Sequence, residues 1–124
     1  MKDKYEQLCK KYPKIFKTNC ITCGEGWYDI VEQVVKLIDN LTELNKYPPI
    51  EIVQIKEKFG QIRIYYTITD ESTEAQDAFI SGMIESAISF SGLICENCGN
   101  RSKVYNRNGW YSTICKKCYK EAYE

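Results

Sequence analysis

Two Cys-x-x-Cys pairs near the C-terminus constrain this chain of 124 residues more than any other feature. A chain of this length buries only a modest core, so a bound metal ion would add stability. Thiolates hold zinc about 2.3 Å from the metal in tetrahedral sites, and each Cys-x-x-Cys turn supplies two of the four ligands. We therefore predict one structural Zn²⁺ per chain, bound by Cys95, Cys98, Cys115 and Cys118.

The local signals around these cysteines resemble a treble-clef zinc finger over residues 93–124. Gly99 follows the first pair, where a positive φ turns backbone amides toward the sulfurs. Asn108-Gly109 is typical of a two-residue hairpin turn. The second pair opens a short helical segment, "CKKCYKEAY". Four sulfur ligands leave no open coordination position, which indicates a structural rather than a catalytic metal.

The other three cysteines, Cys9, Cys20 and Cys23, leave alternatives open. They could form a second metal site only if a carboxylate supplied the fourth ligand. A redox pair at Cys20 and Cys23 is another alternative, although the βαβ context of a thioredoxin motif is missing. We favour the third interpretation, in which Cys9 is a small core residue and the two others are reduced loop thiols.

Composition argues against several function classes. The chain has no histidine, which removes the commonest general base and every Ser-His or Cys-His nucleophile pair. The net charge is zero, with net +4 in residues 1–18 (six basic, two acidic), −7 in 19–92 (five basic, twelve acidic) and +3 in 93–124 (six basic, three acidic). No apolar run approaches the roughly 20 residues that span a membrane, and the start is not a signal peptide. We expect a non-enzymatic cytoplasmic protein without the basic excess of a nonspecific nucleic-acid binder.

Hydrophobic periodicity predicts an α+β fold in which helices cover one face of a small antiparallel hairpin. Helices are expected before Pro13, from Trp27 to about residue 44, and from about 74 to 91, the last with a capping box at Thr73 and Gln76. "GEGW" should begin the second helix and anchor Trp27 in the core. The apolar face of the third helix is predicted to comprise Phe79, Ile80, Met83, Ile84, Ala87 and Ile88. We predict an α+β core at residues 1–92 and a zinc module at 93–124, together forming one compact unit.

The stretch "VQIKEKFGQIRIYY" predicts a hairpin that turns at Phe59-Gly60. Its hydrophobic pattern fixes the register, because an odd loop would mix the apolar and polar sets. The apolar face is predicted to pair Glu57 with Ile62, Ile55 with Ile64 and Val53 with Tyr66. The opposite face then pairs Lys58 with Gln61, Lys56 with Arg63 and Gln54 with Tyr65.

Like charges directly opposite each other destabilise a hairpin, so the Lys56–Arg63 pair needs compensation. One alternative is a neighbouring carboxylate from the acidic middle of the chain. The other is an anionic ligand or partner, held by Gln54, Lys56, Lys58 and Arg63 with Tyr65 as a flat stacking surface. This composition suits a nucleotide, a nucleic-acid strand or an acidic protein surface.

Four motifs occur in order over residues 23–118: "CGEGWYDIVEQV", "VQIKEKFGQIRIYY", "ICENCG" and "GWYSTICKKC". Together they resemble a family of small uncharacterised proteins from bacteriophage and prophage genomes. The resemblance implies a genomic context, and host-cell cytoplasm as the location. By analogy, the leading hypothesis is a zinc-stabilised accessory protein that blocks a host defence component by capturing a protein or a small anionic ligand.

Two other functions remain as alternatives. The first is nucleic-acid binding through the basic hairpin and the basic residues of the zinc module: Arg101, Lys103, Arg107, Lys116, Lys117 and Lys120. The second is an enzyme that uses carboxylates such as Asp29 or Glu57, which no motif supports. The uneven charge also permits a homodimer in which the basic ends of one copy meet the acidic middle of another.

Overall fold

The computed structural model describes residues 3–44 and 47–123. Its elements are α1 (Asp3–Lys11), the 3-10 turn η1 (Glu25–Trp27), α2 (Tyr28–Leu44), β1 (Ile50–Lys58), β2 (Gln61–Ile68), α3 (Glu74–Ser91), β3 (Tyr105–Arg107), β4 (Trp110–Ser112) and α4 (Lys116–Tyr123). The α+β prediction is confirmed, with the strands forming two antiparallel hairpins. Within the described ranges, no helix is long and apolar enough to cross a membrane.

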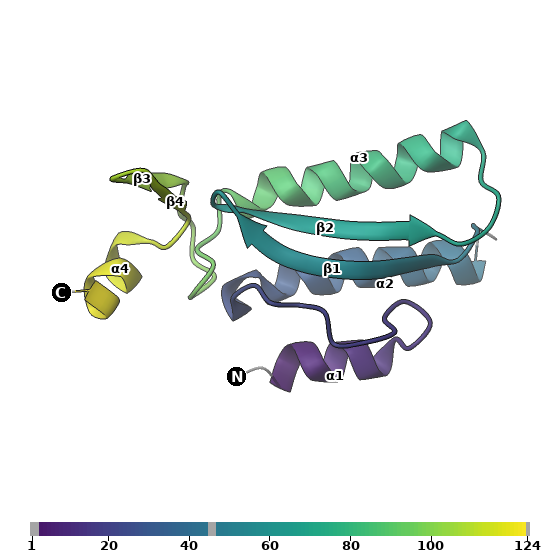
Figure 1. Ribbon diagram of the computed structural model, residues 1–124, viewed down its shortest axis with the longest axis horizontal. Coiled ribbons are helices and arrows are strands. Elements are labelled where there is room, and N and C mark those ends of the chain that lie inside the picture. The colour runs from purple at the N-terminus through teal and green to yellow at the C-terminus, as the bar shows by residue number, and fades with distance from the viewer. Residues whose placement is uncertain (1–2, 45–46, 124) are drawn as a thin grey trace.

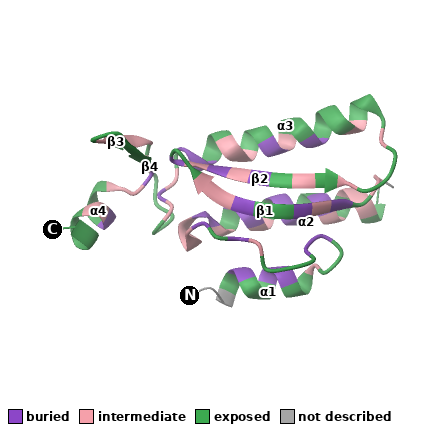
Figure 2. Cartoon of the chain, viewed as in Figure 1, coloured by how far each residue is buried: buried purple, intermediate pink, exposed green. Residues whose placement is uncertain are grey.

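The core lies between the hairpin β1–β2 and the helices that run along it. In Figure 1, α2 and α3 run alongside the hairpin, α1 lies at the lower edge, and β3, β4 and α4 lie together at the left. Trp27 is fully buried, as predicted, together with Val31, Val35 and Ile38 of α2. Figure 2 shows the buried positions concentrated on the sides of these elements that face one another. This packing leaves the far face of the hairpin uncovered by α2 and α3.

Helix α3 begins and ends where the sequence predicts. The Thr73 hydroxyl accepts from the backbone N–H of Gln76, and the Gln76 side chain accepts from that of Thr73, both at 3.0 Å. Ile80 and Ile84 are buried as expected, but Phe79 is 54% exposed, with its ring centre 6.2 Å from that of Tyr47. The prediction that Phe79 belongs to the apolar face of α3 is therefore wrong, and the buried face is narrower than predicted.

The register of β1–β2 agrees with the prediction from the turn as far as the Gln54–Tyr65 pair. Beyond it, the predicted Val53–Tyr66 pair is wrong, because Ile52 lies opposite Tyr66 and the ladder shifts between Ile52 and Gln54. This β-bulge lets both Ile52 and Ile55 face the core, which strict alternation would forbid. Val53 is left 50% exposed on the other side.

A segment expected to be a plain loop covers the outer edge of β1. The N–H of Ile52 donates to the carbonyl of Ile15 at 2.8 Å, and the N–H of Ile55 donates to that of Cys20 at 3.1 Å. The N–H of Thr22 donates to the carbonyl of Ile55 at 2.9 Å. The edge is thus protected from pairing with another chain.

Candidate metal centre and basic hairpin face

The four C-terminal cysteines converge on one point. Their sulfur atoms all lie within 4.8 Å of one another, although the two pairs come from different segments. Cys95 and Cys98 lie in the turn between α3 and β3, whereas Cys115 immediately precedes α4 and Cys118 lies in its first turn. The sulfurs of Cys98 and Cys115 are 3.8 Å apart. This matches the edge, about 3.8 Å, of a tetrahedron whose corners lie 2.3 Å from a central zinc ion.

Backbone amides point at the sulfur of Cys95 and favour the thiolate form of this cysteine. The N–H groups of Cys98 and Cys115 donate to the sulfur of Cys95 at 3.5 and 3.3 Å. Burial raises the pKa of the Cys95 thiol, but hydrogen bonds from the amides of Cys115, Cys98 and Asn97 outweigh this effect and lower it to about 7. Such donors around a ligand set also orient the ligands toward the metal.

Asn97 adds a side-chain donor on the other side of the cluster, 3.2 Å from the sulfur of Cys118. Gly99 takes the predicted positive φ, 84°, which directs the chain back toward the first pair of cysteines. The set could therefore hold a metal ion, and four sulfurs would complete a tetrahedral shell. That arrangement offers no coordination position for a substrate.

The turn that carries Cys95 and Cys98 is docked on the "GEGW" segment. The indole N–H of Trp27 donates to the carbonyl of Ile94 at 2.9 Å, and the N–H of Gly26 donates to that of Glu96 at 2.7 Å. A Cβ at Gly26 would collide with the carbonyl of Cys95. The N–H of Gly24 donates to the Glu96 carboxylate at 2.8 Å. The cysteine cluster is thus fixed to the N-terminus of α2.

The remaining cysteines do not form a second cluster. In the part of the chain that the structure describes, the C-terminal set is the single group of three or more potential ligands. The thiols of Cys9 and Cys20 donate to Asn19 Oδ1 and to the carbonyl of Ile52, at 3.9 and 3.8 Å. Burial raises the pKa of both thiols. These are the properties of reduced structural cysteines.

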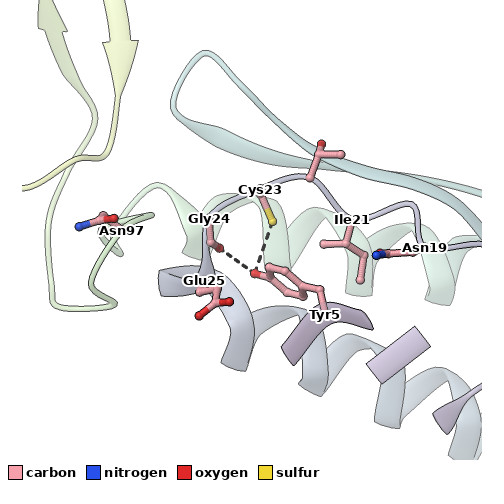
Figure 3. Close-up of a pocket in the computed structure, with 8 residues that line it drawn as sticks. Tyr5, Asn19, Ile21, Cys23, Gly24, Glu25 and Asn97 are labelled. Atoms are coloured by element: carbon pink, nitrogen blue, oxygen red, sulfur yellow. Dashed lines mark hydrogen bonds between the residues drawn. The ribbon is translucent and has the colours of Figure 1, made fainter. Parts of the chain in front are cut away.

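Cys23 borders a cavity of about 680 Å³ at the junction of α1, the loop after Asn19, and Asn97 (Figure 3). Its thiol donates to the hydroxyl of Tyr5 at 3.5 Å, and that hydroxyl donates to the carbonyl of Gly24 at 2.7 Å. Burial raises the pKa of Cys23 to about 11 and also raises the pKa of Tyr5. Both groups are therefore neutral near pH 7, which disfavours a nucleophilic role for Cys23.

The predicted basic face is present on the side of β1–β2 away from the core. Lys56 lies opposite Arg63, Lys58 opposite Gln61, and Gln54 opposite Tyr65. The Nζ of Lys56 is 5.7 Å from the centre of the Tyr65 ring, which is 43% exposed. We call these five residues (Gln54, Lys56, Lys58, Arg63 and Tyr65) the basic hairpin face.

One of the two predicted alternatives, a carboxylate that pairs with Lys56 or Arg63, is not present among the described residues. The ion pairs among the described residues join Lys14 to Glu43 and Lys36 to Glu32, and none involves the basic hairpin face. Arg63 instead donates to the carbonyl of Ile62 at 3.1 Å. The like-charge pair Lys56–Arg63 is thus left without an internal anionic partner in this part of the chain.

Comparison with known proteins adds no relative from which a function could be transferred. The chain matches no protein-family model, no curated protein and no solved structure. The function is therefore inferred from the geometry of its own residues.

Proposed function

We propose that this protein is a non-enzymatic binding protein, stabilised by one zinc ion, that holds an anionic partner on the basic hairpin face. The observation that carries the proposal is the uncompensated Lys56–Arg63 pair. Like charges directly opposite each other cost up to about 1 kcal/mol. A carboxylate or phosphate of a partner would convert this cost into charge-assisted hydrogen bonds.

The zinc ion has a structural role in this proposal. The spacing and convergence of the four sulfurs support zinc over harder cations, which prefer oxygen ligands. The order of the first cysteine turn, the hairpin β3–β4 and the helix α4 supports a treble-clef arrangement. The lack of histidine and the closed ligand set both support a binding role rather than catalysis.

The shape of the basic hairpin face favours a large partner over a small ligand. Neither the cavity beside Tyr5 nor an apolar groove of about 390 Å³ between α2 and α3 is lined by a residue of this face. Small ligands are usually buried in such concave sites. The resemblance to phage and prophage proteins makes the host cell the expected source of the partner.

The proposal is tested with Lys56→Gln and Arg63→Gln, using Lys10→Gln as a control of equal charge change. Lys10 is exposed on α1, away from β1–β2. Binding of a fluorescent oligoglutamate, followed by anisotropy at low salt, should weaken in the first two variants and stay unchanged in the control. Equal binding by all three variants would show that only the net charge matters, and the proposal would then be abandoned.

A further inference from the structure

The tip of the hairpin β1–β2 carries an exposed aromatic ring on an unfavourable backbone. Phe59 has φ +55°, a left-handed conformation that bulky side chains rarely adopt, and its ring is 64% exposed. Asn108 occupies the same position of the turn in β3–β4 with φ +57°. Asn is the usual residue at such a position. A strained residue with an exposed ring indicates a contact function.

Lysines lie over aromatic rings both on the basic hairpin face and at this tip. The Nζ of Lys56 lies 5.7 Å from the centre of the Tyr65 ring, and the Nζ of Lys58 lies 5.7 Å from that of Phe59. The Phe59 ring in turn meets the edge of Tyr111, with the ring centres 6.3 Å apart. Tyr111 is 43% exposed and belongs to β4, so the series crosses from one hairpin to the other.

The two hairpins come close together at this point. A Cβ added at Gly60 would lie 2.9 Å from a methyl group of Val104. The rings at Tyr65, Phe59 and Tyr111 therefore form a series that runs from one hairpin to the other, with Lys56, Lys58 and Arg63 beside them. We call these six residues the aromatic–cationic strip.

We propose that the aromatic–cationic strip binds a single-stranded nucleic-acid segment. The inference rests on the proposed function and names the chemistry of its partner. The lysines and the arginine would contact phosphates, and the exposed ring faces would stack on bases. The planes of Phe59 and Tyr111 are 86° apart, so these two rings would stack on bases of different orientation. Strand β2 covers about 13 Å from Tyr65 to the turn at about 3.3 Å per residue, and the Phe59 and Tyr111 ring centres are a further 6.3 Å apart. The strip is thus roughly 20 Å long, comparable with a site of about four nucleotides.

Two features favour an unpaired strand over the other anionic partners. Stacking requires bases with free faces, which a duplex does not offer. An acidic protein surface would satisfy the cations but would leave the strained Phe59 without an explanation. The zero net charge of the chain also means that electrostatics alone gives weak binding, so stacking must supply a large share of the affinity.

The test compares three labelled probes at low salt: an oligo-dT of about 12 nucleotides, a duplex of equal length and an oligoglutamate. Phe59→Asn should weaken oligo-dT binding about 5-fold or more, the loss that corresponds to one stacked base, and leave oligoglutamate binding unchanged. Lys56→Gln should weaken the binding of oligo-dT and of oligoglutamate. For oligo-dT it should also lower the slope of log affinity against log salt concentration by about 1. Phe79→Asn is the matched control, because Phe79 is exposed on α3 outside the strip.

The outcomes separate this inference from the proposed function. Oligoglutamate binding that depends on Lys56, without oligo-dT binding, would leave the proposed function intact and overturn the nucleic-acid assignment. Duplex binding as tight as oligo-dT binding would also overturn it. If neither probe responds to Lys56→Gln, both proposals are wrong. Should Phe59→Asn fail to fold, Tyr65→Ser tests the same stacking at an exposed strand position.

Discussion

The hairpins β1–β2 and β3–β4 close with turns of nearly the same backbone geometry but different residues. Phe59-Gly60 has φ angles of 55° and 84°, and Asn108-Gly109 has 57° and 88°. In each turn, the N–H of the glycine also donates to the side chain of the residue three positions earlier. Glu57 accepts from the N–H of Gly60 at 2.9 Å, and Asn106 accepts from that of Gly109 at 2.7 Å.

The strands that carry the two turns differ in length and in packing. Strands β1 and β2 are long, and fully buried residues such as Ile55 and Ile62 fix them to the core. Strands β3 and β4 have three residues each and lie between the two cysteine pairs of the C-terminal cluster. A hairpin fixed to a large core tolerates an unfavourable turn residue, whereas a short isolated hairpin does not. This comparison explains how Phe59 persists in the first hairpin.

Metal removal should produce the largest difference between the hairpins. We expect about one zinc per chain, and we expect a strong chelator or Cys115→Ser to unfold β3–β4 and α4, since structural zinc contributes on the order of 10 kcal/mol to such modules. The long hairpin should keep its dispersed amide resonances in NMR spectra, because its core does not include the metal ligands. Native spectra for β3–β4 in metal-free protein would contradict the structural role of the metal.

The two tryptophans provide the next comparison. Trp27 is fully buried and joins α2 to the turn that carries Cys95, so Trp27→Ala should lower the free energy of unfolding by about 3–5 kcal/mol. Trp110 is the first residue of β4 and is 74% exposed, so Trp110→Ala should change the free energy of unfolding by less than about 0.5 kcal/mol. Chemical denaturation of both variants measures the difference. Comparable losses would mean that Trp110 has a packing role that its exposure does not indicate.

Exchanging the turn residues tests the comparison directly. Asn108→Phe should lower the free energy of unfolding by about 1 kcal/mol, because the left-handed conformation is unfavourable for Phe. Phe59→Asn should raise the free energy of unfolding by up to about 1 kcal/mol. Loss of the edge contact with Tyr111 reduces this gain by the stabilisation that the contact provides. Thermal melts of the two variants should therefore shift in opposite directions. A large loss in Phe59→Asn would show instead that the ring holds the two hairpins together.

Local sequence patterns predict the helices, both turns and the cysteine cluster, because each depends on neighbours in the chain. Periodicity places α2 and α3, the Thr73–Gln76 box fixes the start of α3, and the spacing of the two cysteine pairs brings four sulfurs together. The register near Phe59-Gly60 follows for the same reason, since the turn sets it.

Long-range packing produces the features that sequence patterns miss. The bulge at Val53 arises because burying both Ile52 and Ile55 outweighs regular alternation. The docking of Gly26 on Cys95 joins residues far apart in the chain, and a glycine before a helix gives no sign of which backbone it will approach. The strain at Phe59 could have been noticed, because Phe-Gly replaces the usual Asn-Gly of such turns.

The last comparison concerns how each hairpin accommodates a cation. Arg107 of β3 lies between the rings of Tyr105 and Tyr119, 4.4 and 3.9 Å from their centres, and donates to the carbonyl of Ile114 at 3.1 Å. Its charge is thus stabilised within the protein, and Arg107→Gln should cost about 1–2 kcal/mol. Lys56 faces Arg63 instead, with no carboxylate partner among the described residues.

Lys56→Gln should therefore leave the free energy of unfolding equal or raise it by a few tenths of a kcal/mol, since it removes a like-charge pair. Arg63→Gln should do the same, and the double variant should gain less than the sum of the two, because the repulsion can be removed only once. Urea denaturation of the three variants at low salt measures these differences. A stability loss in Lys56→Gln as large as that in Arg107→Gln would mean that the basic hairpin face is stabilised by contacts within the protein. The proposal of an anionic partner would then be abandoned.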